Sequence, residues 1–278
     1  MSTDKTIQML IFDGNPNKMI MCESSNSNVR IYKVSRNELR AFEKRNDANN
    51  TGIYFLFGKD DNNNTTVYIG EAENILSRLK QHLSDKDYWN DAVAIISNND
   101  FLNKAHIKYL ENEFYSLAYE AARAVIINKS VPTRSSISEY DEATLEGFIN
   151  DTKLLVNTLG YKVFDLIEED LDNTSPLFYI RAARGANGFG KIVSDGFAVL
   201  KGSTIAANVT NSFPSGSNKR RQYLIDNGII SSDYTFLKDC VFSSPSQAAE
   251  IVMGRSANGL TEWKTEDGQI LKSIFENL

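Results

Sequence analysis

The sequence predicts an α+β protein with two small domains. Aromatic and β-branched runs at residues 52–58 and 66–70 are typical of strands. Apolar residues spaced by three and four in residues 104–122 predict an amphipathic helix. A chain of 278 residues is long enough for two modest domains. We expect four parts along the chain, namely residues 1–46, 47–135, 136–170 and 171–278.

The first part is expected to be a strand-rich preface. A turn is predicted at residues 13–16, where Asp, Gly, Asn and Pro follow one another. Ser35 is expected to begin a short helix, with Glu38 completing a capping box three residues later. The strands predicted before this helix are residues 6–12, 18–22 and 28–33.

The second part is expected to hold a small three-stranded, mainly antiparallel sheet flanked by helices. The polar segment 59–65 closes a hairpin between the two aromatic strands. A helix is predicted over residues 71–83, with Leu79 and Leu83 among the buried positions of its apolar face. A third strand is expected at 93–97, ahead of the helix over 104–122.

The remaining parts are a linking helix and a second α+β domain. An acidic helix over 139–159, ended by Gly160, is expected to bridge the two domains. A glycine-rich loop at 185–190 lacks the GxGxxG spacing of a nucleotide cradle. Ser244 is expected to cap a later helix. The other predicted elements are strands at 177–181, 196–200 and 235–242, a helix at 219–227 and a hairpin at 267–268.

The net charge of −6 is unusual for a protein that meets a polyanion. Residues 1–135 hold 17 basic and 17 acidic residues, residues 136–170 hold 2 and 9, and residues 171–278 hold 11 and 10. The acidic surplus therefore belongs to one connecting segment. The charge argues against strong nonspecific DNA binding. It does not argue against a nuclease, because phosphate binding depends on the local field at a site.

The cysteines and the apolar runs point to a cytoplasmic protein. Cys22 and Cys240 are far apart and neither has a CxxC partner, which indicates a reducing compartment. No apolar run approaches the roughly 18–20 residues of a membrane helix. The first residues lack the long apolar run and the cleavage site of a signal peptide. We expect no membrane contact.

Several side chains in the second part suit phosphodiester hydrolysis, which needs a positioned water and cations that stabilise charge on the phosphate. Tyr54 and Tyr68 fall on the two hairpin strands, where cross-strand neighbours approach closely. Arg78 and His82 are four residues apart and share one helix face. Glu111 borders the apolar stripe of the next helix. We expect these edges to converge on one shallow cleft.

These residues resemble the pattern of the GIY-YIG nucleases. The triplets GIY at 52–54 and YIG at 68–70 are followed by Arg78 and His82 on one helix and by Glu111 on the next, in the order of that family. The spacer between the triplets is slightly longer than most. The segments YIGEAENILSRLKQHLSDKDYWN and LNKAHIKYLENEF are similar to a bacterial subfamily with an N-terminal strand preface.

The resemblance implies a role for each residue. Tyr54 would be the general base or would position the water, with Tyr68 in support. Arg78 would bind the scissile phosphate, and Glu111 would hold one divalent ion, Mg²⁺ or Mn²⁺, with waters around it. His82 would assist proton transfer or hydrogen-bond Tyr54. Because the ordinary pKa of tyrosine is ~10, a metal or Arg78 has to favour the phenolate, or Tyr54 only orients the water.

The last part resembles a small domain often appended to these nucleases, and more loosely the RAMA type of restriction and methylation proteins. The resemblance rests on residues 197–206, 220–225 and 242–264. It suggests nucleic-acid recognition, although Trp263 is also a natural core residue and 219–221 also a solvated helix start. The candidate nucleic-acid-binding residues are Lys80, Asn128, Lys201, Arg220 and Arg221.

The leading hypothesis is a metal-dependent endonuclease that hydrolyses DNA and carries a C-terminal domain for targeting or sensing DNA. One alternative is a nucleic-acid-binding or regulatory protein with a weak or idle site. Another is a purely structural interaction module, since a strand tyrosine taken alone is usually a packing residue. No small organic cofactor is expected. The oligomeric state and the choice between DNA and RNA stay open.

Overall fold

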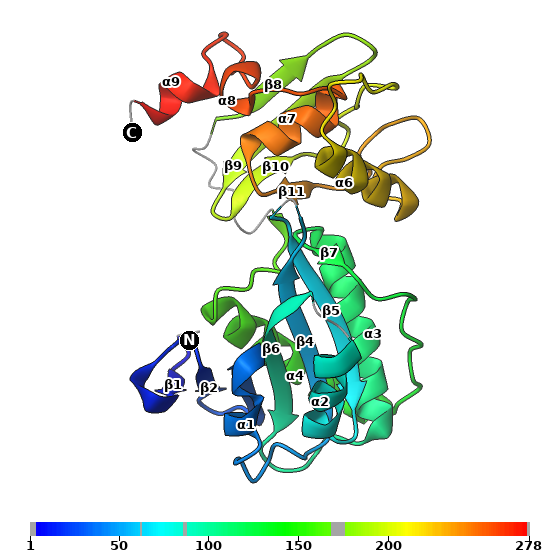
Figure 1. Ribbon diagram of the computed structural model, residues 1–278. Coiled ribbons are helices and arrows are strands. Elements are labelled where there is room, and N and C mark those ends of the chain that lie inside the picture. Colours follow the sequence, from blue (N-terminus) through cyan, green and yellow to red (C-terminus); the bar gives the residue numbers. More distant parts are fainter. Residues whose placement is uncertain (1–3, 62, 86–87, 168–175, 277–278) are drawn as a thin grey trace. The chain divides into compact units, whose positions relative to one another are not determined.

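The computed structural model describes residues 4–61, 63–85, 88–167 and 176–276, which form two compact units, each with its own sheet and helices (Figure 1). The predicted α+β class is therefore confirmed. The first unit comprises Met1–Asp60, Thr65–Tyr119 and Val125–Phe164, and the second comprises Asp61–Asn64, Glu120–Ala124 and Asp165–Leu278.

The sheet of the first unit has seven strands in the order β1-β2-β3-β6-β4-β5-β7. All neighbours are antiparallel except β5 and β7. The expected three-stranded sheet is its β4–β5–β6 part, and the preface strands extend the same sheet because β3 pairs with β6. The strands are β1 (Ile7–Ile11), β2 (Met19–Ser24), β3 (Val29–Ser35), β4 (Gly52–Lys59), β5 (Thr65–Ala72), β6 (Trp89–Ser97) and β7 (Val125–Ile126).

Helices cover both faces of this sheet. On one face, Tyr54 and Leu79 belong to a core that includes residues of α1 and α2. On the other face, the Phe55 ring lies 5.2 Å from that of Phe114 on α3, and α4 packs against β2 and β3. Figure 1 shows the two helical layers. The helices are η1 (Phe12–Gly14), η2 (Arg36–Glu38), α1 (Leu39–Phe42), α2 (Ile75–Asp85), α3 (Lys104–Ala121) and α4 (Glu139–Thr158).

The structure bears out the sequence signals at the start of one predicted helix but not at another. The capping box predicted at Ser35 does not form, because Ser35 is still paired with Asp91 in β3 and its side chain makes no cap hydrogen bond. At α4, the Ser138 hydroxyl accepts the Asp141 N–H at 3.1 Å, and Gly160 follows the helix with a φ of +92°. The helix predicted over 139–159 is thus present, and it packs on the sheet of the first unit.

The second unit has a four-stranded antiparallel sheet in the order β11-β10-β9-β8. Strand β9 begins at Asn187, inside the segment 185–190 that was expected to be a glycine-rich loop. A Cβ on Gly190 would lie 2.3 Å from the Ala198 carbonyl oxygen, so the glycine permits close pairing with β10. The elements are β8 (Phe178–Arg181), β9 (Asn187–Val193), β10 (Gly196–Val199), α6 (Ser215–Asp226), β11 (Cys240–Phe242), α7 (Pro245–Met253), α8 (Gly259–Glu262) and α9 (Leu271–Phe275).

Both cysteines are buried free thiols. Burial raises the pKa of Cys22 to about 11 and raises that of Cys240 as well, so both are protonated at neutral pH. As predicted, the Ser244 hydroxyl caps α7 by accepting the Gln247 N–H at 3.2 Å. Among the described residues, no helix is long and apolar enough to cross a membrane.

Candidate active site

The glycines of both sequence triplets are required by close contacts in the sheet. Gly70 on β5 pairs with Tyr54 on β4, and a Cβ on Gly70 would lie 2.4 Å from the Tyr54 hydroxyl oxygen. A Cβ on Gly52 would lie 2.2 Å from the Ile95 carbonyl oxygen of β6. Gly70 therefore leaves room for the phenol, and Gly52 lets the strand carrying that phenol pair with β6.

We expect Gly52→Ala and Gly70→Ala to lower the free energy of unfolding by about 1–3 kcal/mol each, because the added methyl group overpacks the sheet. The measurement is urea unfolding followed by circular dichroism. Gly147→Ala in α4 is the matched control, since a Cβ there has nothing within 4 Å and should stabilise the helix by up to about 1 kcal/mol. Equal effects at all three positions would contradict the packing account.

The Tyr54 hydroxyl lies between Arg78 and His82 of α2. It accepts a hydrogen bond from the Arg78 Nε–H at 3.2 Å and is 2.7 Å from His82 Nε2. The direction of the Tyr54–His82 hydrogen bond depends on the tautomer of the imidazole, because the phenol oxygen that accepts from Arg78 can either donate its own hydrogen or accept a second one. Tyr54 is 0% exposed and His82 is 3% exposed. The buried Tyr54 ring, itself bonded to His82, thus helps to fix the orientation of the Arg78 guanidinium.

His82 is buried where a leucine was expected. Leu83, predicted on the apolar face, is 39% exposed. His82 takes the buried position because its Nε2 lies 2.7 Å from the Tyr54 hydroxyl. Helix α2 begins at Ile75, and the Asn74 side chain accepts the Ser77 N–H at 2.9 Å. The buried positions of α2 are Ile75, Leu76, Leu79 and His82.

Tyr68 is the more accessible of the two phenols. Its ring is 6.2 Å from that of Tyr54 and meets the His82 ring edge-on at 5.4 Å. Tyr68 is half-buried, whereas Tyr54 is fully buried. Burial raises the pKa of Tyr54, against the lowering effect of Arg78, so Tyr54 is protonated at neutral pH. Hydrogen bonding to Tyr54, and less strongly to Tyr68, raises the pKa of Arg78.

Glu111 of α3 belongs to the same electrostatic environment. The pKa of its carboxyl is raised to about 7, first by burial and then by the charge of Glu71, while Arg78 and Lys108 act to lower it. Glu111 in turn raises the pKa of Tyr54. The structure therefore brings Glu111 to the side of the protein that holds Arg78. Sequence reasoning missed Glu71, although it follows the second triplet directly.

The two carboxyl groups fit a divalent cation. A partly desolvated carboxylate beside a second one is costly to ionise, and a bound cation offsets that cost. Hard oxygen ligands suit Mg²⁺ or Mn²⁺, which commonly bind one or two carboxylates and several waters. Within the described parts of the chain, no group of three or more His, Cys, Asp or Glu side chains gathers around a possible metal position.

Asn128 supports the strand that carries Tyr68. Its side-chain oxygen accepts the Ile69 N–H at 3.0 Å, and its amide nitrogen donates to the Ile69 carbonyl at 2.7 Å. Strand β7 pairs with β5 only at Thr66 and Val67, so the Asn128 side chain continues the pairing along the strand. In this conformation Asn128 positions the protein backbone between Tyr68 and Gly70.

The other candidate nucleic-acid contacts differ in accessibility. Lys80 is exposed and pairs with Glu43 at 2.6 Å, and Lys201 is exposed on the second unit. Arg220 and Arg221 are buried, at 3% and 5% exposed. Arg221 donates to the Ala206 and Ile251 carbonyls, and Arg220 lies over the Tyr223 ring and beside Cys240. Trp263 is a core residue, 0% exposed.

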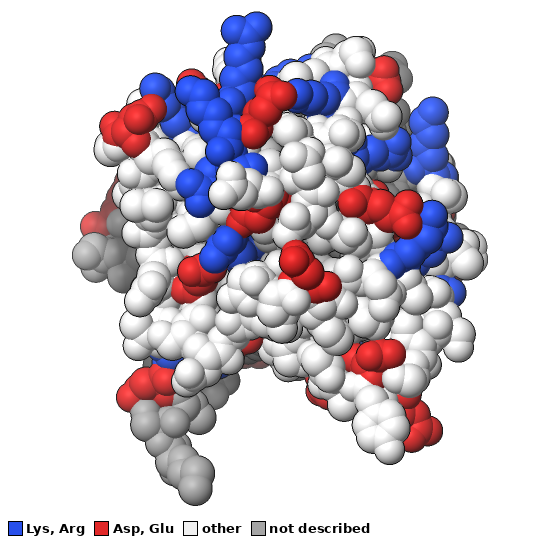
Figure 2. Space-filling view, turned by 90° about the horizontal axis from the view of Figure 1, so that it is seen from below, with Lys and Arg blue, Asp and Glu red and all other residues white. Residues whose placement is uncertain are grey.

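Figure 2 shows acidic and basic side chains interspersed over one face of the protein. This mixture agrees with the overall charge of −6.

Comparison with protein families agrees with this geometry. Residues 50–140 match the GIY-YIG catalytic domain. The chain therefore contains a GIY-YIG catalytic domain. In this GIY-YIG protein, residues 178–275 match a second family, a domain of unknown function (DUF4357). No curated protein and no solved structure matches the chain.

Proposed function

We propose that this GIY-YIG protein is a metal-dependent endonuclease that hydrolyses DNA phosphodiester bonds. The observation that carries the proposal is the Arg78 guanidinium, which is held by the buried Tyr54–His82 pair and shares its surroundings with the Glu111 carboxyl. A fixed cation and a desolvated carboxylate side by side are what phosphoryl chemistry requires. The family match supplies the nuclease class.

Arg78 would bind the scissile phosphate. Its Nε–H is committed to Tyr54 and its Nη1 donates to Gln81 at 3.0 Å, so the orientation of the planar group is set before substrate arrives. The remaining N–H groups can donate to two phosphate oxygens, and these bonds strengthen as negative charge builds up in the transition state. Preorganisation of this kind costs no rearrangement during the reaction.

Glu111, with Glu71 nearby, would hold the divalent ion, Mg²⁺ or Mn²⁺. Such an ion supplies Lewis-acid stabilisation of charge on the phosphate and leaving oxygens. Glu111 itself contributes a carboxylate on a rigid helix. The charge of Lys108 lowers the Glu111 pKa and so favours the ionised form that binds cations.

We propose that Tyr68 is the phenol that orients the attacking water. Sequence analysis gave this role to Tyr54 and a supporting role to Tyr68. Tyr54 is fully buried and its hydroxyl is already bonded to Arg78 and His82, whereas Tyr68 is half-buried. We therefore assign Tyr54 to holding Arg78 in place and Tyr68 to orienting the attacking water.

Tyr68→Phe and Tyr54→Phe should separate these roles. Tyr68→Phe is expected to lower kcat by about 10²-fold with little change in KM, as when a group that aids water attack is removed. Tyr54→Phe removes one of the hydrogen bonds that orient Arg78 and should raise KM as well as lower kcat. Steady-state cleavage of a fluorescent oligonucleotide measures both. If Tyr54→Phe alone gave the pure kcat defect, Tyr54 would be the residue that activates the water.

The proposed activity is tested with the full chain on supercoiled plasmid DNA. Nicking is expected with Mg²⁺ or Mn²⁺ and is expected to cease with a chelator. A single-stranded RNA of matched length, cut more slowly than single-stranded DNA, would support DNA as the substrate. Absence of cleavage under all metal conditions, with DNA binding retained, would favour the alternative of an idle site.

We also propose that the C-terminal domain helps to hold DNA and that the protein acts in the cytoplasm. Exposed Lys201 supports the first point, and two free thiols support the second. The full chain carrying Lys201→Glu is expected to bind DNA more weakly and with a shallower salt dependence than the wild type. An unchanged affinity and salt slope would remove Lys201 from the DNA contact.

A further inference from the structure

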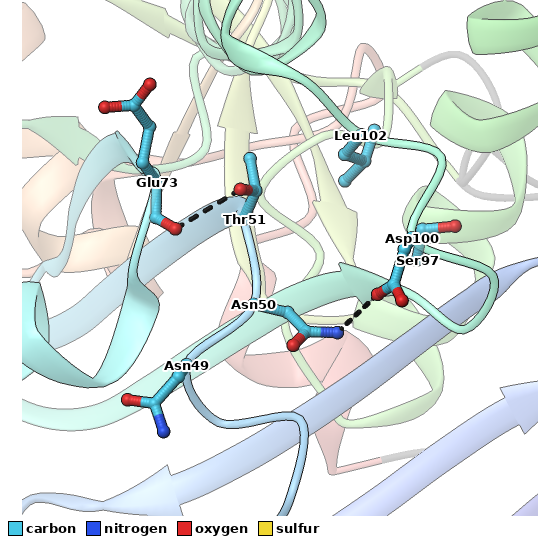
Figure 3. A pocket seen from close by; sticks show the side chains of 7 residues that line it. All are labelled: Asn49, Asn50, Thr51, Glu73, Ser97, Asp100 and Leu102. Atoms are coloured by element: carbon cyan, nitrogen blue, oxygen red, sulfur yellow. Dashed lines mark hydrogen bonds between the residues drawn. The ribbon is translucent and has the colours of Figure 1, made fainter.

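A polar pocket of about 300 Å³ lies in the first unit, at the start of β4 and the end of β6. Figure 3 shows the side chains that line it. Asn50 donates to the Asp100 carboxylate at 2.8 Å, and the Thr51 hydroxyl donates to the Glu73 carbonyl at 3.2 Å. These bonds join loops far apart in sequence and build its walls. The lining residues are Asn49, Asn50, Thr51, Glu73, Ser97, Asp100 and Leu102.

The chemistry of the pocket favours a neutral group that donates hydrogen bonds. The carboxylates of Glu73 and Asp100 disfavour a phosphate. The Glu73 carboxylate is paired with Lys104 at 3.2 Å, whereas Asp100 is bonded to the neutral Asn50 amide and keeps acceptor capacity on its carboxylate. Leu102 adds an apolar contact to the lining. A planar ring with an amino group matches this combination.

The pocket lies next to the ends of two elements that carry the candidate active site, because Glu73 follows β5 and Leu102 precedes α3. Lys104, which pairs with Glu73 at the pocket, precedes Glu111 by seven residues on α3, which corresponds to about 10 Å along the helix. Glu73 follows Glu71 by two residues. Successive nucleotides are about 3.4 Å apart in a duplex strand and farther apart in an extended one. The distance of about 10 Å along α3 therefore corresponds to about three nucleotide steps or fewer.

Resting on the proposed nuclease function, we propose that this pocket receives an unpaired nucleobase that flanks the cleaved bond and carries an exocyclic amino group. The amino group donates to the Asp100 carboxylate, as cytosine N4 does to acidic side chains in DNA readers. Thymine presents a carbonyl at the same ring position and would face a carboxylate. The pocket therefore selects cytosine over thymine, and an unpaired or flipped base over a stacked one.

The test is equilibrium binding of the full chain to fluorescent oligonucleotides, oligo-dC and oligo-dT, of about nine nucleotides. The assay contains a chelator, so that no cleavage occurs. The wild type is expected to bind oligo-dC about tenfold more tightly than oligo-dT. Asp100→Asn replaces an acceptor oxygen with a donor and should bring the ratio to about one or below. Since Asp100 has a φ of +54°, asparagine is a conservative choice for the backbone.

Asp13→Asn is the matched control, because Asp13 is an exposed aspartate with the same φ of +54° outside the pocket, and it should keep the wild-type ratio. A wild-type ratio near one, or an unchanged ratio in Asp100→Asn, would overturn the pocket proposal. Failure of the nuclease proposal is seen separately, either as no plasmid cleavage with Mg²⁺ or as cleavage that Arg78→Ala does not slow. The binding ratio is read without cleavage and is unaffected by that result.

Discussion

Arg78→Ala is expected to lower the rate of DNA cleavage by about two to three orders of magnitude while the protein stays folded. The guanidinium is exposed enough to meet a phosphate, yet Tyr54 and Gln81 fix its orientation. Removing it takes away charge stabilisation that is greatest in the transition state, so kcat should fall more than KM rises. Single-turnover cleavage of a labelled duplex, with Mg²⁺ in excess, measures the chemical step.

Two further variants make this result specific. Arg40→Ala removes an exposed arginine of α1 and should leave the rate unchanged. Arg78→Lys keeps the charge but not the planar fork, so it should recover only part of the rate. If Arg78→Ala cleaved as fast as the wild type, the nicking would come from elsewhere and the assignment of Arg78 would fail.

Glu111→Gln is expected to lower cleavage by about three orders of magnitude, the loss expected when several kcal/mol of charge stabilisation is removed. The amide has nearly the same shape as the carboxyl but carries no charge to attract a divalent ion. The substitution also removes a titrating carboxyl, because the pKa of Glu111 is raised to about 7, mainly by burial. Mn²⁺ titration of cleavage, run on wild type and variant, is the measurement.

The control is Glu146→Gln, which neutralises an exposed glutamate of α4 and should behave as the wild type. Circular dichroism should show both glutamine variants folded. Full activity of Glu111→Gln at ordinary Mn²⁺ concentrations would show that this carboxylate does not hold the ion, and Glu71 would be the next residue to substitute.

Local sequence patterns predicted the strands and the helix face of four candidate residues better than they predicted the extent of the sheet. Tyr54 and Tyr68 lie in one hairpin, and Arg78 and His82 share a helix face, because strand alternation and helical periodicity are local properties. Helical periodicity placed Glu111 at the border of the apolar stripe of its helix, whereas its role as a metal ligand followed only from the family resemblance. That the preface joins the same sheet was not predictable, since the pairing of β3 with β6 is a long-range contact that no local pattern encodes.

Sequence patterns did not predict which polar side chains are buried. His82 displaced Leu83 from the core of α2 because it bonds to Tyr54, and a hydropathy pattern cannot register such a pair. Arg220 and Arg221 seemed suited to phosphate contact, yet both are buried in the second unit. Strand β9 was missed because glycines, which usually weaken strands, are there required by close backbone approach.

The most direct test of the site is the position of a divalent ion in a crystal of the full-length Tyr68→Phe variant bound to DNA and Mn²⁺. Anomalous scattering locates the manganese. The account predicts manganese at about 2.1–2.2 Å from a Glu111 carboxylate oxygen and in contact with the phosphate that Arg78 binds. Manganese bound away from Glu111, with the phosphate out of reach of Arg78, would contradict it.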